Sequence, residues 1–336
     1  MLVKILGAGA GGGFPQWNCN CPGCQKARRG EAKSLTQSSI AVRSDNGPWF
    51  LINASPDVRQ QLEMLRTEET ELSLNESKRS NPFAGIILTD GEIDHTTGLI
   101  LLRESAQPLK VYSTYSVKRG LTTGYPLFST LQNYCGVEWF PLKPGESLTP
   151  INSDSPDLDV EVFPLSTKPP KYMQKTKGGE ENENEESHKT KEGNKNDEPE
   201  IWGIGLTFRD RKTGGVLTYT PGLGQLNDSL QERFANSNCI LVDGTFWQNE
   251  ELPSLGIGSR TAFDMGHLPL SGDDGCIMKL SKLKSQNSKV PQSSKPRKIL
   301  VHINNTNPIL IPNSPEHQVV KDAGIEIGYD GLTLEI

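Results

Sequence analysis

The sequence predicts an α/β fold that forms one unit with two β-sheets. Strand-like segments occur in both halves of the chain, and helical segments interrupt each set of strands. A length of 336 residues corresponds to about two average domains, but α/β folds of this size often form a single unit. The chain holds 33 Gly and 23 Pro, and 34% of its residues are hydrophobic. We therefore expect many loops around a substantial core.

The first predicted strands form the start of one sheet. Leu2–Leu6 is an apolar segment that suits a strand. Ser39–Arg43 and Trp49–Asn53 are also strand-like, and they flank Asp45-Asn46-Gly47, a sequence typical of a hairpin turn. These three strands should therefore lie close to one another in the fold.

A helix and a buried strand are predicted next. Pro56–Leu65 should be helical, because Ser55 is suited to cap a helix and Pro56 to begin one. The apolar segment Ala84–Thr89 then predicts a buried strand that leads directly into Asp90.

The second half of the chain predicts a further set of strands. They share short apolar runs bounded by polar or glycine-rich segments. They cover Val160–Pro164, Gly203–Phe208, Gly215–Tyr219, Cys239–Asp243 and Lys298–His302. The last two strands end in residues able to bind a metal, Asp243 and His302.

Two charged segments are predicted to be insertions that contribute nothing to the core. Residues 174–200 contain no aliphatic or aromatic residue and carry five Lys against nine Asp or Glu. Residues 281–298 carry six Lys or Arg and no acidic residue. Such a basic segment could bind nucleic acid. A solvated insertion is favoured, because no aromatic residues are interleaved with the charges.

The overall composition excludes several classes of protein. The formal net charge of −6 argues against a general nucleic-acid binder. No apolar run approaches the roughly 18 residues of a membrane-spanning helix, so we expect no membrane association. The apolar start at Met1–Leu6 is too short for a secretory signal, so we expect a cytoplasmic protein.

Three of the six cysteines lie within six residues, as Cys19, Cys21 and Cys24. In a chain that is not predicted to be secreted, such a cluster favours a metal over a disulfide. Zinc binds thiolates and usually takes four ligands at a structural site. His267 is the best candidate for the fourth ligand, because His188 falls in the acidic insertion. A redox pair or free thiols remain the alternative for the cysteines, and an ordinary hydrogen-bonded histidine for His267.

A glycine-rich segment follows the first strand. Gly7, Gly9 and Gly12 match G-x-G-x-x-G, the pattern of a dinucleotide site. Such a site requires a helix directly afterwards, and Phe14–Cys19 does not resemble one. We therefore expect a loop whose backbone approaches another part of the protein closely.

The richest cluster of candidate ligands follows the buried strand that ends at Thr89. Asp90, Glu92, Asp94 and His95 lie within six residues. A solvated turn is the alternative explanation for such a cluster, but its place at the end of a buried strand favours a site. The spacing is similar to the H-x-H-x-D-H metal loop of metallo-β-lactamase-like proteins. Asp243 and His302 resemble the later ligands of that superfamily.

Several further segments resemble the coenzyme PQQ (pyrroloquinoline quinone) biosynthesis protein B family. The resemblance extends over nearly the whole chain apart from the two insertions. It is carried by Phe14–Cys21, Thr36–Ile40, Asn53–Asp57, Ile93–Leu99, His302–Pro308 and Ala323–Gly331. It implies one metallo-β-lactamase-type αββα sandwich over residues 1–336, with two mixed sheets and flanking helices. It also implies a place in the cytosolic pathway in which a Glu and a Tyr of a peptide become linked and form PQQ.

The same resemblance separates this chain from the hydrolases of the superfamily. Asp90 and Glu92 stand where a dizinc hydrolase has histidines, and the histidine expected near Pro164–Lys168 is absent. The ligands that remain are Asp94, His95 and His302, with Asp243 able to bridge or support. Two histidines and a carboxylate with open positions form the ligand set of non-haem Fe(II) oxygenases. Asp90 and Glu92 would then surround the ligands, orienting a histidine or holding a proton.

We therefore expect an iron-dependent oxygenase that hydroxylates the tyrosine ring of the Glu–Tyr-derived intermediate with O₂. Its structural zinc would lie at the cysteines. One alternative is a carrier that binds PQQ or a precursor for transport to the periplasm. Another is a metal-dependent phosphodiesterase, which the missing histidines disfavour. Contacts with other pathway proteins and a homodimer remain open.

Overall fold

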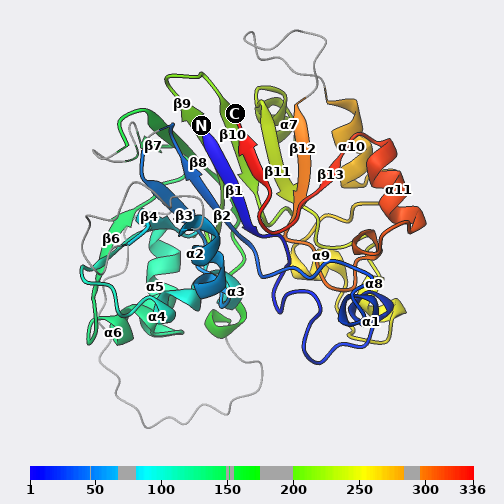
Figure 1. Ribbon diagram of the computed structural model, residues 1–336, viewed down its shortest axis with the longest axis horizontal. Coiled ribbons are helices and arrows are strands. Elements are labelled where there is room, and N and C mark those ends of the chain that lie inside the picture. Colours follow the sequence, from blue (N-terminus) through cyan, green and yellow to red (C-terminus); the bar gives the residue numbers. More distant parts are fainter. Residues whose placement is uncertain (46, 67–80, 149–150, 152–154, 175–199, 284–295) are drawn as a thin grey trace.

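The computed structural model describes residues 1–45, 47–66, 81–148, 151, 155–174, 200–283 and 296–336. Within these residues, two seven-stranded sheets pack face to face, and helices lie on their outer sides (Figure 1). The order of layers is helix, sheet, sheet, helix. This arrangement confirms the expected αββα sandwich with two mixed sheets.

The first sheet combines an antiparallel and a parallel half. Its strands, in spatial order, are β14 (Thr333–Glu335), β1 (Leu2–Gly7), β2 (Ser39–Arg43), β3 (Trp49–Ile52), β4 (Phe83–Ile87), β5 (Leu109–Ser113) and β6 (Val137–Pro141). The pairs from β14 to β3 are antiparallel, and those from β3 to β6 are parallel. The pairing of β2 with β3 confirms the predicted hairpin.

The second sheet repeats this arrangement. Its strands, in spatial order, are β13 (Glu326–Ile327), β12 (Arg297–Val301), β11 (Cys239–Asp243), β10 (Val216–Thr220), β9 (Gly203–Asp210), β8 (Leu158–Ser166) and β7 (Ser147–Leu148). The pairs from β7 to β10 are antiparallel, and those from β10 to β13 are parallel.

Alternating side chains build the layers of the first sheet. In β3, Phe50 and Ile52 join the core between the sheets, whereas Trp49 and Leu51 face the helices. Those helices are α2 (Val58–Arg66), α4 (Gly98–Leu101), α5 (Tyr115–Thr123) and α6 (Leu127–Leu131). Each buries its apolar residues against the strands, which holds the sheet between two hydrophobic layers.

Helices also cover the second sheet. They are α7 (Asp228–Ala235), α10 (Cys276–Lys282) and α11 (Pro315–Asp322), and their apolar residues join the same core as the strands. The short elements are α1 (Pro22–Arg28), α3 (Ile93–Thr96), η1 (Lys171–Met173), α8 (Glu251–Ser254), α9 (Ala262–Met265) and η2 (Pro308–Leu310). In Figure 1, α1, α3, α8 and α9 lie toward the same end of the sandwich.

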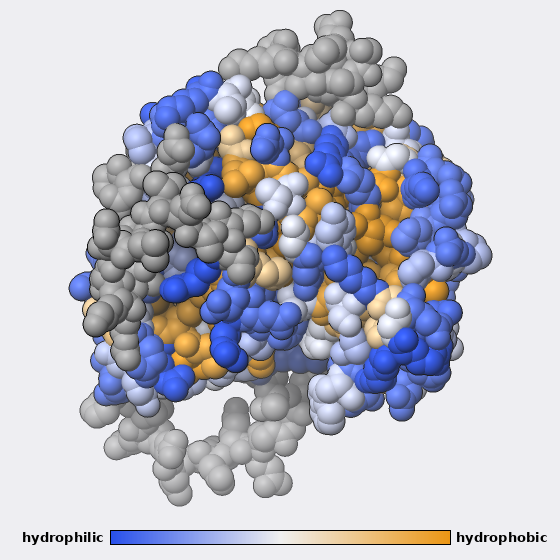
Figure 2. All heavy atoms as spheres, viewed as in Figure 1, coloured by the Kyte–Doolittle hydropathy of each residue, from blue (hydrophilic) through white to orange (hydrophobic). Residues whose placement is uncertain are grey.

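The hydropathy of the surface varies across the face drawn in Figure 2. Hydrophilic side chains cover the region of α1, and hydrophobic side chains reach the surface near β13 and α11. A groove of about 280 Å³ near β13 and α11 is lined in part by Leu310, Ile327 and Tyr329. None of the described helices is both long and apolar enough to cross a membrane.

Two predicted boundaries differ from the structure. The helix predicted from Pro56 begins at Val58, because the Ser55 hydroxyl accepts a hydrogen bond from the Asp57 amide (3.1 Å) and residues 56–57 form a turn. The ends of the predicted basic insertion also belong to the core. Residues 281–282 lie in α10 and residues 297–298 in β12. Lys298 is buried, and its Nζ donates to the Leu280 carbonyl.

The remaining parts of both predicted insertions, residues 175–199 and 284–295, lie outside the described residues. At one border of the acidic segment, Glu200 forms an ion pair with Arg119 at 2.6 Å between carboxylate oxygen and guanidinium nitrogen.

The loops after three parallel strands meet at one edge of the sandwich. The loop after β4 carries Asp90 to His95, β11 ends at Asp243, and His302 follows β12 directly. The loop after β1 crosses from the first sheet to the second, where the Ala10 amide donates to the Ile303 carbonyl (2.9 Å). This edge therefore gathers side chains that are more than two hundred residues apart in the sequence.

Candidate metal centre

The strand-end group consists of Asp94, His95 and His302, whose ligand atoms all lie within 4.8 Å of one another. Oδ2 of Asp94 lies 3.7 Å from Nε2 of His95 and 3.7 Å from Nε2 of His302. Both histidines are buried, whereas Asp94 is partly exposed. The structure therefore brings together the three residues that the sequence predicts as iron ligands.

Asp90 fixes the orientation of the His95 ring. Both carboxylate oxygens of Asp90 lie 2.8 Å from Nδ1 of His95. This leaves Nε2 facing the other two members of the group, and it is a buried nitrogen without a hydrogen-bond partner. A buried polar atom normally has a partner, and ligand histidines commonly give their second nitrogen to a carboxylate. The group therefore fits a bound cation.

The charges within the group reinforce one another. Burial alone would lower the pKa of His95, but the Asp90 and Asp94 carboxylates outweigh burial and raise it to about 9. Burial alone would raise the pKa of Asp94, but the His95 and His302 rings lower it overall. Burial alone would also raise the pKa of Asp90, but His95 lowers it overall. The carboxylates therefore stay ionised at neutral pH, as metal ligands must.

The segment Asn53–Asp57, part of the family resemblance, supports this arrangement. Asn53 adopts φ of +62°, and its side-chain amide exchanges hydrogen bonds with Thr89. The Thr89 hydroxyl in turn donates to Oδ2 of Asp90 at 3.0 Å. A chain of hydrogen bonds therefore runs from Asn53 through Asp90 to the His95 ring.

Thr245 holds the His302 ring. Its Oγ1 lies 2.8 Å from Nδ1 of His302, and it also donates to the His302 carbonyl oxygen at 2.9 Å. His302 adopts φ of +55°, a conformation unusual for a residue other than glycine and often found at functional sites. The sequence analysis did not single out Thr245, although it stands two residues after Asp243.

Asp243 supports the strand-end group from beside it. Its Oδ2 accepts a hydrogen bond from the Leu223 amide (2.8 Å) and lies 2.6 Å from Nδ1 of His267. Its Oδ1 accepts from the Thr245 amide and lies 4.0 Å from Nδ1 of His302. Both oxygens are therefore engaged. Of the two roles that the sequence left open for Asp243, the geometry favours support over direct ligation.

His267 does not lie with the cysteines, and the expectation that it completes a zinc site there is wrong. It forms a second group of possible ligands with Asp243 and His302, and its ring stacks on His302 with centroids 5.4 Å apart. The local backbone explains this position of His267. The helix α9 ends at Gly266 with φ of +89°, and the His267 amide donates a hydrogen bond to the Ala262 carbonyl. Burial lowers the pKa of His267, but Asp243 raises it overall.

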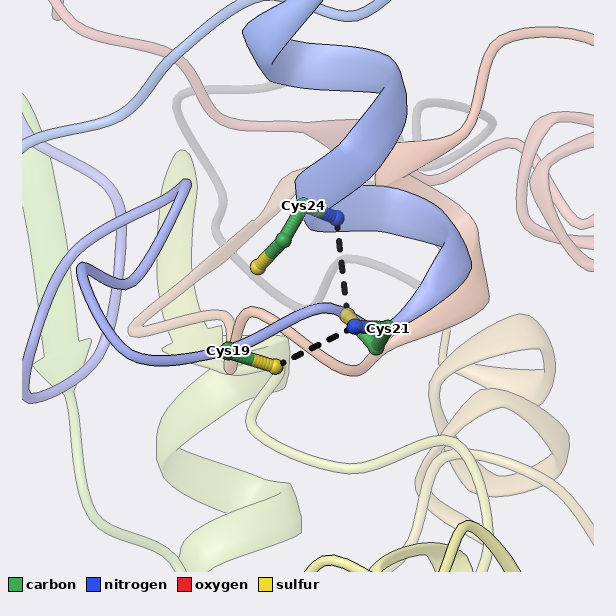
Figure 3. Close-up of side chains that lie close together, drawn as sticks. All are labelled: Cys19, Cys21 and Cys24. Carbon is green, nitrogen blue, oxygen red and sulfur yellow. Dashed lines mark hydrogen bonds between the residues drawn. The ribbon is translucent and has the colours of Figure 1, made fainter.

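Cys19, Cys21 and Cys24, the cysteine group, point their sulfurs toward one another (Figure 3). Cys21 precedes α1 as its N-cap, and its Sγ accepts a hydrogen bond from the Cys24 amide at 3.4 Å. Sγ of Cys19 accepts one from the Cys21 amide, also at 3.4 Å. All three are buried and none forms a disulfide. The loop therefore directs three sulfurs to one point, as the sequence predicts for zinc.

The glycine-rich loop approaches the strand-end group. A Cβ atom placed on Gly11 would lie 3.1 Å from Oδ2 of Asp94, so a larger residue would crowd that carboxylate. The Gly12 amide donates to Gln37, and the Ala8 amide donates to Asp330. This confirms the prediction of a loop that brings its backbone close to another part of the protein, here the candidate ligand Asp94.

Glu92 lies apart from the ligands. Its side chain is exposed, while partial desolvation and the charges of Asp90 and Asp94 raise its pKa to about 7. No hydrogen bond from its carboxylate to a ligand histidine is seen among the described residues. The expectation that Glu92 surrounds the ligands is compatible with this position, and it stays a prediction.

Two positively charged side chains contact the segment that leads to His267. Lys168 Nζ and Arg260 Nη2 both donate to the carbonyl oxygen of Asp264, three residues before His267. The neighbouring Tyr172 hydroxyl donates to the Gly91 carbonyl at 2.6 Å, which joins η1 to the loop of the strand-end group. Sequence reasoning missed these cations, because nothing in their local pattern distinguishes them from ordinary surface charges.

The chain is similar in sequence to known proteins over most of its length. The Beta-lactamase superfamily domain matches residues 48–303. The chain is 40% identical over 338 residues to coenzyme PQQ synthesis protein B of Methylococcus capsulatus, covering 99% of each chain. It is 38% identical to the protein of the same name from Pseudomonas putida, with both chains covered fully.

Two solved structures are also similar to this chain. Zinc-bound PqqB from Methylobacterium extorquens superimposes with a TM-score of 0.80 at 31% identity, and both chains are covered fully. A diphosphatase from the PhnP family gives a TM-score of 0.61 at 18% identity and covers 100% of this chain and 96% of its own. At that identity, the second likeness concerns the fold alone.

Proposed function

Because this chain belongs to the family of coenzyme PQQ synthesis protein B, within the β-lactamase superfamily, we propose that it acts in PQQ biosynthesis as an iron-dependent oxygenase. The substrate is the Glu–Tyr-derived intermediate, and the reaction is hydroxylation of its tyrosine-derived ring. One oxygen atom of O₂ enters the ring. The other leaves as water, with two electrons from a reductant.

The observation that carries this proposal is the composition of the strand-end group. Asp94, His95 and His302 offer one carboxylate and two imidazoles from one side, which is the ligand set of non-haem iron oxygenases. Fe(II) bound there would supply the activation of oxygen, whereas zinc does not change its oxidation state. The unpartnered Nε2 of His95 supports a bound cation at this place.

The residues around the ligands orient the histidine rings and exchange protons with the substrate. Asp90 and Thr245 each occupy Nδ1 of a ligand histidine, so both rings turn Nε2 toward Asp94. Asp243 likewise occupies Nδ1 of His267. Nε2 of His267 is then the nitrogen that exchanges a proton with a phenolic substrate beside His302.

The charges beside the group suit an acidic substrate. An intermediate made from Glu and Tyr carries carboxylates. Lys168 and Arg260 both donate to the Asp264 carbonyl, on the segment that leads to His267. Cations at the rim of a site attract and orient anionic ligands. They therefore support a substrate with carboxylates on the side of the site formed by α9.

The two alternatives make different demands on the same residues. A carrier would need the cations but no open metal positions, and it would bind PQQ without consuming oxygen. A phosphodiesterase would need the histidine-rich first metal site, and Asp90 in that site is already engaged with His95. The phosphodiesterase is therefore disfavoured. The carrier is distinguished from the oxygenase by experiment.

The test uses protein purified without oxygen and loaded with Fe(II). With ¹⁸O₂, ascorbate and the Glu–Tyr-derived precursor, we expect one ¹⁸O atom in the hydroxylated product, measured by mass spectrometry. His317→Ala serves as a control, because His317 bonds the Ile309 carbonyl outside the strand-end group. Tight PQQ binding without labelled product from the wild type would favour the carrier.

A further inference from the structure

Tyr172, in η1, places its ring in a socket lined by three glycines. A Cβ atom on Gly91 would lie 2.9 Å from the Tyr172 hydroxyl oxygen, and one on Gly120 would lie 3.3 Å from it. A Cβ atom on Gly124 would lie 2.9 Å from Cδ2 of the ring. Contacts of 2.9 Å are shorter than Cβ atoms make in proteins, so a larger residue at Gly91 or Gly124 would displace the ring. The socket therefore fits this tyrosine closely.

The Tyr172 hydroxyl holds one end of a peptide unit beside the strand-end group. It donates a hydrogen bond to the Gly91 carbonyl at 2.6 Å. The amide of the same peptide unit belongs to Glu92, and it donates to Oδ1 of Asp90 at 2.9 Å. A peptide unit is planar, so fixing its oxygen also fixes the direction of its N–H. Tyr172 therefore sets the direction in which this N–H meets the Asp90 carboxylate.

Asp90 carries this constraint to a metal ligand. Its carboxylate lies 2.8 Å from Nδ1 of His95, which leaves Nε2 of that ring 3.7 Å from Oδ2 of Asp94. Hydrogen bonds in such a chain strengthen one another, and the partner of a ligand histidine affects metal affinity without touching the metal. We propose that Tyr172 is a positioning residue for the strand-end group, acting through this peptide unit and Asp90.

The ring of Tyr172 also supports the far end of the segment that carries the ligands. It packs against Tyr125, with ring centroids 5.7 Å apart. The Tyr125 hydroxyl lies 3.1 Å from the Thr97 hydroxyl, which donates to the Ile93 carbonyl at 2.7 Å. Ile93 begins α3, the helix that carries two of the ligands. Contacts that start at Tyr172 therefore hold both ends of this segment.

The Tyr172 hydroxyl keeps its proton in this position. Burial and the charges of Glu92 and Asp90 raise its pKa above the usual value. A protonated hydroxyl can donate, so the bond to the Gly91 carbonyl persists at neutral pH. Phenylalanine would fill the same socket without donating, and Tyr172→Phe therefore isolates the hydrogen bond. This role rests on the proposed function only in treating the strand-end group as a metal site.

The first experiment measures binding of Fe(II) alone to the full chain, without substrate or oxygen. We expect Tyr172→Phe to bind Fe(II) about three- to tenfold more weakly than the wild type, the usual effect of one lost hydrogen bond. Tyr134→Phe is the matched control, because the Tyr134 side chain is exposed after α6, and it should bind like the wild type. Equal affinities of Tyr172→Phe and the wild type would overturn the assignment.

The second experiment combines this change with Gly91→Ala. Gly91 does not adopt a left-handed φ, so alanine suits its backbone, and the added Cβ would press on the Tyr172 hydroxyl. We expect Gly91→Ala alone to weaken Fe(II) binding by roughly tenfold. In the Tyr172→Phe background the hydroxyl oxygen is gone, so Gly91→Ala should cause little further loss. Fully additive losses would show that the two residues act independently and would contradict the proposal.

Thermal unfolding of the metal-free proteins separates positioning from support of the fold. We expect the Tm of Tyr172→Phe to fall by only about 2 °C, as for one hydrogen bond in a chain of this size. A larger fall in Tm with unchanged Fe(II) affinity would mean that the hydrogen bond serves the fold alone. Wild-type protein that binds Fe(II) but consumes no oxygen would contradict the oxygenase and leave the role of Tyr172 intact.

Discussion

The cysteine group and the strand-end group bring their candidate metal ligands together in opposite ways. The first takes its three thiols from six consecutive residues and buries all of them. The second takes Asp94 and His95 from the loop after β4 and His302 from the distant end of β12, and it leaves its carboxylate partly exposed. Sulfur ligands suit zinc, and mixed nitrogen and oxygen ligands suit a metal that works on a substrate.

This difference teaches how one fold separates a structural role from a chemical one. A local loop that buries every ligand closes its site, so a metal bound there would contribute to folding. Ligands brought from the ends of two strands meet at an edge of the sheets, where a substrate would reach them. The loop from His302 to Asn307 touches both groups, so changes at each group should show how independent they are.

The largest expected effect comes from His302→Ala. The change removes one of two imidazole ligands, so we expect oxygen-dependent turnover to be lost and iron content to fall far more than zinc content. The fold should remain, because the cysteine group keeps its sulfurs. Metal analysis and circular dichroism check this. Full iron content and turnover in the variant would show that the strand-end group is not the site.

A strong effect on stability is expected from Cys21→Ser. The change removes one thiolate, and structural zinc contributes directly to the free energy of folding. We expect loss of one zinc equivalent and a fall in Tm of at least about 5 °C. Cys135→Ser, at a half-buried site outside the cysteine group, should keep its zinc. An unchanged zinc content in Cys21→Ser would refute the zinc assignment.

Asp90→Asn should have a moderate effect on the strand-end group alone. The carboxylate of Asp90 orients His95 through Nδ1, and removing such a partner typically weakens metal binding about 10- to 100-fold. Fe(II) titration measures the change, and zinc at the cysteine group should not respond. Glu92→Gln, at the exposed neighbouring carboxylate, is the control with the smaller expected loss. Equal losses in both variants would mean that Asp90 acts only through its charge.

Glu251→Gln probes the loop between the two groups. Burial raises the pKa of Glu251 to about 7, and its carboxylate accepts hydrogen bonds from Thr306 and from the Trp247 amide. A folded-state pKa above the usual value near 4.5 means that folding favours the protonated form. Stability from this group is fully present below about pH 4.5 and is lost as the pH rises through about 7.

We therefore expect the Tm of the wild type to fall between pH 5 and pH 8 by more than the Tm of Glu251→Gln. The effect should be a few degrees and should not alter the metal content of either group. Thermal unfolding at the two pH values measures it. Identical pH dependence in both proteins would show that Glu251 is ionised at no cost in the folded state.

The smallest effect is expected from replacing residues 175–199 with a short Gly/Ser linker. The segment has no aliphatic or aromatic residue, and the entropy of closing a loop changes slowly with its length. Glu200 should be kept because it pairs with Arg119. We expect Tm and turnover close to those of the wild type, and a large loss of either would mean that the segment binds the core or a partner.

The strands and most metal-binding residues could be predicted from the sequence because their signals are local. Apolar runs that end at Thr89, Asp243 and His302 identify strands whose ends converge in an α/β sandwich. The spacing of Cys19, Cys21 and Cys24 identifies a sulfur cluster without any knowledge of the fold.

The rest depends on contacts between distant segments. His267 lies with Asp243 because Gly266 turns the chain after α9, and composition does not reveal that turn. Thr245 and Asn305 are ordinary polar residues until the fold places them beside His302 and the cysteines. Lys298 belongs to a basic run, yet it is buried in β12 and its Nζ donates to the Leu280 carbonyl of α10, so burial outweighs composition.

Oxygen uptake tests the central claim most directly. The wild type is loaded at the strand-end group with either Fe(II) or Zn(II), and the Glu–Tyr-derived precursor is added with ascorbate in an oxygen electrode. The account predicts substrate-dependent oxygen uptake by the iron form, in step with hydroxylated product, and none by the zinc form. If fully iron-loaded protein consumes no oxygen beyond the substrate-free control and forms no hydroxylated product, the oxygenase proposal is wrong.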